Sequence, residues 1–180
     1  MAALLRAGEE VIAARGFEAA TMAEIAARAG APIGSLYRFF PNKEALADAL
    51  IRHYSELIDT AFENIDTRRE SLTTEAFADT LLASLVDFRG ETHAAVVALL
   101  DARPDGSARR GEFHDAFLRQ LARVLKLRDP RLSSKKAADM SVVLLQNLKT
   151  MKSLSKERAA GAIAELRAMT RLYLESKLGE

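Results

Sequence analysis

The sequence has no cysteine and contains little proline and glycine. Without cysteine the chain can form no disulfide and hold no thiol nucleophile, which fits a reducing compartment, and we expect the cytoplasm. Its four prolines and nine glycines leave long uninterrupted segments. The alternating β-branched pattern of strands is also missing. These features predict an all-α protein that is helical along nearly its whole length.

Long hydrophobic runs are missing as well. The longest one, residues 94–100, is far shorter than the roughly 20 apolar residues that a membrane-spanning helix needs. Met1 is not followed by a basic segment and a cleavage site, so we expect no signal peptide. The chain has 180 residues, of which 49% are hydrophobic, and this is enough for a substantial core. We therefore expect a globular protein with no membrane partner.

Patterns that indicate catalysis or metal binding are not found in the sequence. His53, His93 and His114 have no second ligand at metal-like spacing, and we interpret each as a half-buried helical residue. There is no glycine-rich phosphate loop and no Gly-x-Ser-x-Gly elbow. We expect no enzyme activity, no metal and no cofactor.

What the sequence does contain is a close series of helix signals in residues 21–46. Thr21 can cap a helix that follows it, with Glu24 in the capping-box position. Gly30 can end that helix in the left-handed conformation, and Pro32 lies where a second short helix can begin. A bend of about three or four residues between two short helices predicts a helix-turn-helix.

The second helix of this motif has one face suited to the core and another suited to DNA. Leu36 and Phe40 share the core-facing side at i,i+4 spacing. The other side has hydroxyl, guanidinium and aromatic groups, which can contact phosphates and base edges. Phe39 either contacts a thymine methyl or covers the core. The predicted DNA-contact residues are Thr21, Ile33, Gly34, Ser35, Tyr37, Arg38, Phe39 and Lys43.

This stretch resembles the DNA-binding signature of the TetR family of bacterial transcriptional repressors, with the likeness extending over about residues 4–50. The resemblance implies an all-helical homodimer, with a three-helix DNA-binding domain in residues 1–46 and a ligand-binding and dimerisation domain in residues 47–180. It also implies a repressor that a small apolar or amphipathic effector releases from a near-palindromic operator in double-stranded DNA. The matching positions are Thr21-x-x-x-Ile25-Ala26-x-x-Ala29-Gly30, then Gly34-Ser35-Leu36-Tyr37-x-x-Phe40-x-Asn42-Lys43-x-x-Leu46.

The charge of the chain is unusual for a DNA-binding protein. The formal net charge is only +1, and residues 1–50 contain more acidic than basic residues. Nucleic-acid-binding domains are usually basic. Family members usually have a basic arm before the first helix, so we expect a Lys/Arg-rich extension upstream of Met1 in the source gene. The low charge also leaves a second hypothesis open, a helical ligand-binding or interaction module without operator binding.

The rest of the chain reads as further helices, about nine in all. Residues 103–106 and 128–130 are strong breaks, and Ser107 is predicted to cap the helix after the first of them. Aromatic residues recur at helical spacing between these breaks, and they either fill a core or line a ligand cavity. The candidate pocket residues are Phe62, Phe77, Leu81, Phe113, Phe117 and Gln146.

The last two helices contain more apolar residues than one buried face requires. The first is predicted to run to about residue 153, and Ser155 is predicted to cap the second. A surface helix needs an apolar face of about 100°, so the excess indicates a second packing partner. That partner is either the same two helices of another subunit, in a four-helix bundle, or the remainder of a monomer. The dimer-interface candidates are Val142, Leu145, Ile163, Leu166 and Tyr173.

Overall fold

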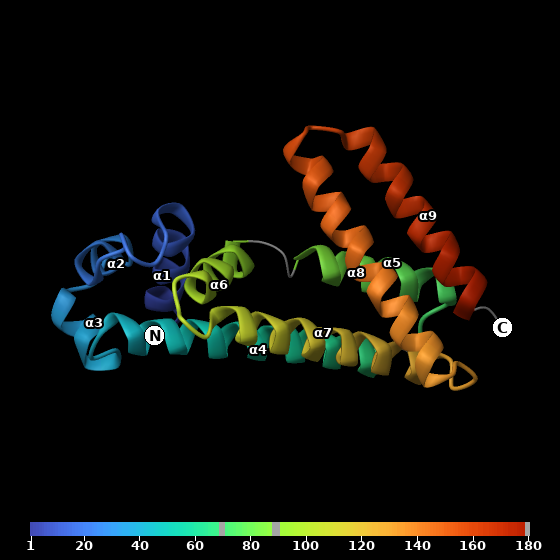
Figure 1. Cartoon of the computed structure of the whole chain (residues 1–180), viewed down its shortest axis with the longest axis horizontal. Coiled ribbons are helices and arrows are strands. Elements are labelled where there is room, and N and C mark those ends of the chain that lie inside the picture. The colour runs from blue at the N-terminus through green and yellow to red at the C-terminus, as the bar shows by residue number, and fades with distance from the viewer. Residues whose placement is uncertain (69–70, 88–90, 179–180) are drawn as a thin grey trace. The chain divides into compact units, whose positions relative to one another are not determined.

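The computed structural model describes residues 1–68, 71–87 and 91–178, and these residues are predominantly helical (Figure 1). No strand occurs within them, so the all-α prediction of about nine helices is confirmed. In the same ranges no helix is long and apolar enough to cross a bilayer. The helices are α1 (Ala2–Arg15), α2 (Met22–Arg28), α3 (Ile33–Phe39), α4 (Lys43–Arg68), α5 (Thr74–Asp87), α6 (Glu91–Asp101), α7 (Gly106–Arg128), α8 (Ser134–Lys156) and α9 (Ala160–Leu178).

The chain forms two compact units. The first contains α1 to α3, α4 up to Ile58, α6, and α7 up to Phe113. The second contains the remaining parts of α4 and α7 together with α5, α8 and α9. Two long helices therefore contribute residues to both units. The functional division into residues 1–46 and 47–180 concerns what each part binds, and it stays a prediction.

The core of the first unit forms where the sequence predicted a small N-terminal core. Ile12, Ile25 and Leu36 are fully buried, so α1, α2 and α3 each contribute one side chain that has no contact with water. Phe17, in the loop between α1 and α2, is also buried and fills the space beside them. Helix α1 packs against both α2 and α6. This packing supports α2, and α3 in turn packs against α2.

The second unit has its core between α4, α5, α7 and α8, with α9 packed against α5 and α8. Phe62 and Phe77 are its largest fully buried side chains. Helices α8 and α9 lie side by side, joined by a short turn (Figure 1). The side-chain amide of Asn147 on α8 donates a hydrogen bond to the hydroxyl of Thr170 on α9, with an N···O distance of 3.0 Å.

Two predicted helix starts are wrong. Helix α7 already begins at Gly106, so Ser107 lies inside it and does not cap it. Helix α8 continues to Lys156, so Ser155 lies in its last turn instead of before α9. The chain turns just after that, where Arg158 adopts a left-handed conformation with φ of +56°. Neither glycine nor proline marks this turn, so the sequence had no local signal for it.

Candidate nucleic-acid interface

Helix α2 is fixed at its start by the predicted capping box. The hydroxyl of Thr21 accepts a hydrogen bond from the backbone N–H of Glu24 at 3.2 Å, and the Glu24 carboxylate accepts one from the Thr21 N–H at 3.1 Å. The same hydroxyl donates to the Glu24 carboxylate at 2.9 Å. Because the cap already uses this hydroxyl as donor and acceptor, Thr21 has little capacity left for a phosphate.

The turn between α2 and α3 is fixed by its own backbone bonds. The N–H of Ala31 donates to the carbonyl of Ala26 at 3.0 Å, and the N–H of Gly30 donates to that of Ala27 at 3.1 Å. Gly30 has φ of +63°, which favours glycine, and the pair of bonds is a Schellman motif. Pro32 then precedes α3 without a side-chain cap. The predicted helix-turn-helix geometry is confirmed.

Helix α3 exposes most of the residues predicted to contact DNA. Leu36 is fully buried and faces the core, whereas Ile33, Tyr37 and Phe39 are 46%, 48% and 50% exposed. Phe39 thus leaves half of its surface in water while its ring lies 6.4 Å from that of the buried Phe40, so both alternatives given for it, a thymine contact and a cover for the core, stay predictions. Gly34 and Arg38 are also exposed, and Ser35 is half-buried. The structure places these side chains on one short helix, and their contact with DNA stays a prediction.

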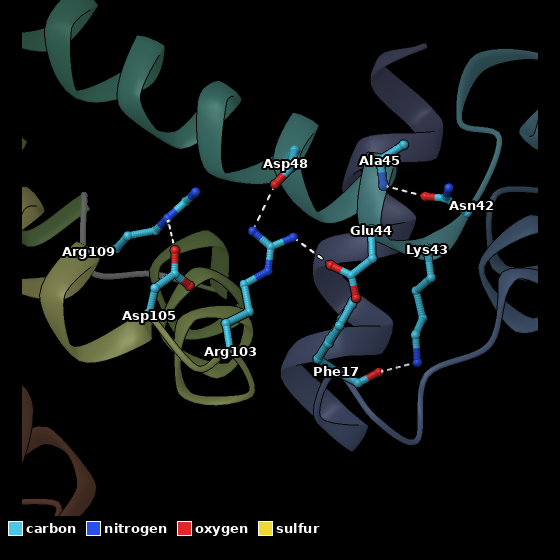
Figure 2. Close-up of polar contacts among 9 residues, drawn as sticks. All are labelled: Phe17, Asn42, Lys43, Glu44, Ala45, Asp48, Arg103, Asp105 and Arg109. Carbon is cyan, nitrogen blue, oxygen red and sulfur yellow. Dashed lines mark hydrogen bonds and ion pairs between the residues drawn. The ribbon is translucent and has the colours of Figure 1, made fainter.

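Lys43, at the start of α4, has a different environment from the one predicted. Its ammonium group donates a hydrogen bond to the carbonyl of Phe17 at 2.9 Å (Figure 2). It also donates to the carbonyls of Glu18 and Ala20, at 3.1 and 3.3 Å. It also lies 4.6 Å from the centre of the Phe17 ring. An ammonium has three donors, so all of them are engaged by the loop before α2. A phosphate contact by Lys43 requires at least one of these bonds to break.

Asn42 forms the predicted cap of α4. Its side-chain oxygen accepts a hydrogen bond from the N–H of Ala45 at 2.8 Å (Figure 2). The start of α4 is therefore held twice, by the cap and by the Lys43 ammonium.

Most basic side chains in residues 1–50 are paired internally. Arg28 forms an ion pair with Glu10, and Arg15 forms one with the capping residue Glu24. By contrast, Arg38 is exposed and makes no hydrogen bond or ion pair to any residue that the structure describes. Arg38 is therefore the cation of this segment that is best placed to meet a phosphate or a base edge.

The candidate pocket residues do not form a single group. In the second unit, Phe62 is fully buried and its ring meets the ring of Phe117 edge-on, with centroids 5.4 Å apart. Phe113 instead belongs to the first unit, where its ring lies 6.3 Å from that of Tyr54. Gln146 is exposed on α8. The buried Phe77 and Leu81 lie on α5 in the second unit, and the assignment of all six residues to a pocket stays a prediction.

The candidate dimer residues also differ in their exposure. Val142 is 46% exposed, whereas Leu145 is 6% exposed and therefore packed within its own chain. Ile163, Leu166 and Tyr173 are half-buried. Three exposed apolar residues that the prediction did not include lie on the same two helices: Val143, Met169 and Leu172.

The comparison with known families concerns the segment that holds this interface. Residues 4–50 match the family described as bacterial regulatory proteins, tetR family. This helix-turn-helix domain belongs to the tetR family. The match confirms the resemblance predicted from the residue spacing between Thr21 and Leu46. No curated protein matches the chain.

Solved structures of similar fold extend beyond the tetR-family domain. A transcriptional regulator from Aquifex aeolicus VF5 is 20% identical, with a TM-score of 0.66 over 97% of this chain and 96% of that one. The fatty acid degradation regulator FadR from Bacillus halodurans is 18% identical, with a TM-score of 0.65 over 99% and 97% of the two chains. FadR from Bacillus subtilis, in complex with stearoyl-CoA, is 17% identical, with a TM-score of 0.63 over 99% and 97%. At these identities the likeness establishes the fold of the whole chain.

Sequence reasoning missed the internal ion pairs around the tetR-family domain. Arg103 was interpreted only as part of a turn, yet its guanidinium bonds Glu44 and Asp48, which lie 59 and 55 residues earlier in the chain (Figure 2). Helical periodicity relates only residues a few positions apart, so it cannot predict an ion pair between residues this far apart in the sequence. They meet only in the folded chain, where the turn between α6 and α7 lies at the start of α4.

Proposed function

We propose that this chain is a ligand-responsive transcriptional regulator that binds double-stranded DNA through α3. In this proposal residues 1–46 are the DNA-binding domain, and residues 47–180 are the ligand-binding and dimerisation domain. The observation that carries the proposal is the exposed face of α3 within a tetR-family domain. Ile33, Tyr37 and Phe39 each leave about half of their surface in water. A major groove accepts a helix, and it offers thymine methyls to apolar groups and phosphates to Arg38.

A homodimer is part of this proposal. Exposed apolar residues on α8 and α9 support it, because a monomer rarely leaves several large apolar side chains exposed on two neighbouring helices. The most exposed of them are Met169 at 64% and Leu172 at 59%. Pairing of α8 and α9 about a two-fold axis would cover them in a four-helix bundle. The same axis would present two α3 helices to the two halves of a near-palindromic operator.

The effector that we propose is a small apolar or amphipathic molecule held by the second unit. The Bacillus subtilis FadR of similar fold was solved with stearoyl-CoA, which has an acyl chain and a polar head. The rings of Phe62 and Phe117 meet edge-on in the second unit, and apolar side chains of this kind are what an acyl chain would contact. We propose that the effector binds best to a state of the cytoplasmic protein that fits the operator poorly, and so releases the repressor.

The test is selection of duplexes from a random DNA pool by the purified protein. We expect enrichment of an inverted repeat, with half-sites about one helical turn apart. Tyr37→Ala should lower the affinity for the selected duplex by about fivefold or more, which corresponds to one lost contact of about 1–3 kcal/mol. The matched control is Leu57→Ala, which removes a side chain on α4 that is also exposed (41%). It should bind as the wild type does.

A second function is favoured by one specific observation. Most basic side chains in residues 1–50 are neutralised internally, which suits a helical ligand-binding or interaction module without operator binding. Selection that enriches no inverted repeat, with a protein that is folded and dimeric, would reject the first function and favour the second.

A further inference from the structure

The turn between α6 and α7, residues 102–105, has a shape that its backbone fixes. The N–H of Arg103 donates to the carbonyl of Leu100 at 3.2 Å, and the N–H of Gly106 donates to that of Arg103 at 3.0 Å. A Cβ at Gly106 would lie 1.5 Å from the Leu100 carbonyl oxygen, so no other residue fits there without moving the backbone. The turn therefore presents Arg103 in one position.

From that position Arg103 reaches two carboxylates on the first two turns of α4. Its Nη2 donates to Glu44 at 2.7 Å, and its Nη1 donates to Asp48 at 2.8 Å (Figure 2). Glu44 and Asp48 are four residues apart, so they lie one above the other on the same face of the helix. The Arg103 side chain is only 11% exposed, although both carboxylates are more than half exposed. One guanidinium thus joins the turn to two points on α4.

The guanidinium of Arg103 stays protonated in this environment. Burial alone would lower the pKa of Arg103, but the hydrogen bonds to Asp48 and Glu44 outweigh burial and raise it. The buried Nε of Arg103 donates to no residue that the structure describes. The hydrogen bonds of the guanidinium described above are those of Nη1 and Nη2, and both go to α4. Without Arg103, two carboxylates would remain one turn apart at the end of α4 nearest to α3, where like charges repel each other and repel phosphates.

The same two turns of α4 support the helix-turn-helix. Asn42 caps them, and Lys43 binds the loop before α2. Helix α7 starts directly after the turn, at Gly106, and extends into the second unit. We propose that Arg103 is a positioning residue, which locks the start of α4 to the α6–α7 turn and thereby sets the affinity of α3 for DNA. This inference rests on the proposed function and names a control point within it.

The experiment compares Arg103→Gln with Arg109→Gln in the full-length protein. Arg109 is a matched control, because it lies next to the same turn and pairs only with Asp105 among the residues that the structure describes, at 2.7 Å. Each variant removes one positive charge from the same region, so a general charge effect is common to both. Two quantities are measured: amide hydrogen exchange of residues 45–49 without DNA, and affinity for the duplex that the wild type selects.

We expect Arg103→Gln to speed exchange in residues 45–49 and to weaken duplex binding at least about fivefold more than Arg109→Gln does, the lower end of usual coupling between sites. Exchange that is unchanged in Arg103→Gln would show that the clamp does not hold α4 and would overturn the inference. Equal duplex affinity of the two variants would also overturn it and leave the proposed function intact. A wild-type protein that selects no duplex refutes the proposed function, and the inference with it.

Discussion

Replacement of Lys43 by methionine separates two roles of a lysine at the start of α4: holding the loop before α2, and contacting a phosphate of DNA. Methionine keeps the apolar stem beside Phe17 but removes the ammonium, and with it three hydrogen bonds to backbone carbonyls. Bonds to charged groups contribute about 1.5–3 kcal/mol each when buried, whereas exposed ones contribute little. The bonds to Phe17 and Ala20 are only partly buried and the one to Glu18 is exposed. We therefore expect a total loss of about 1–2 kcal/mol.

For a chain of this length that loss lowers the Tm by roughly 2–8 °C. Thermal unfolding followed by circular dichroism measures it, and Lys136→Met at an exposed site on α8 is the control that should leave Tm unchanged. Titration of the selected duplex at several salt concentrations shows whether Lys43 contacts a phosphate. Because Lys43 is engaged internally, the salt slope should stay the same. A slope smaller by about 0.9 per subunit, with an unchanged Tm, would mean that Lys43 contacts a phosphate and would refute this reasoning.

Three further outcomes follow from side chains already described. Arg38→Gln should weaken binding to every duplex and reduce the salt slope by about 0.9 per subunit, whereas Arg28→Gln, whose charge is paired, should leave the slope unchanged in the same titration. Leu172→Asp places a charge on the exposed apolar residues of α9 and should give monomers in sedimentation velocity. Hydrogen bonds from Arg131 lower the pKa of Asp129 in the folded protein. The Asp129 carboxylate therefore stabilises the fold at pH values above the ordinary aspartate pKa, and this stabilisation is lost as the pH falls through the lower pKa of the folded state. In Asp129→Asn, acid unfolding should depend less on pH in that range.

The sequence predicted the helix-turn-helix well because each of its signals acts locally. Thr21 caps α2 through a residue three positions away, Gly30 ends the helix through its own backbone conformation, and Asn42 caps α4 in the same way as Thr21 caps α2. Caps of this kind depend on neighbours within one turn, so a chain read residue by residue contains the necessary information.

Features that depend on packing could not be predicted in the same way. Ser155 looked like a cap, but the helix continues past it and turns at Arg158, where no residue type indicates a break. Leu145 lies on an apolar helix whose two faces look alike in sequence, and only the structure shows that it packs inside its own chain. Both features are decided by contacts with other helices, which the order of residues along the chain does not show.

The DNA binding that we propose has to work with a domain of little net charge, and the arrangement of the charges bears on how it would do so. Its arginines at positions 15 and 28 are used to hold α1 on α2, which fixes the direction in which α3 projects. Arg38 alone is left exposed without a partner among the described residues of this segment. In a dimer two such arginines contribute only about 1.8 to the salt slope, so apolar and aromatic contacts from α3 must supply a larger share of the binding energy. Those contacts depend on the angle of α3, so positioning residues such as Arg103 should influence affinity more strongly here than in a highly basic domain.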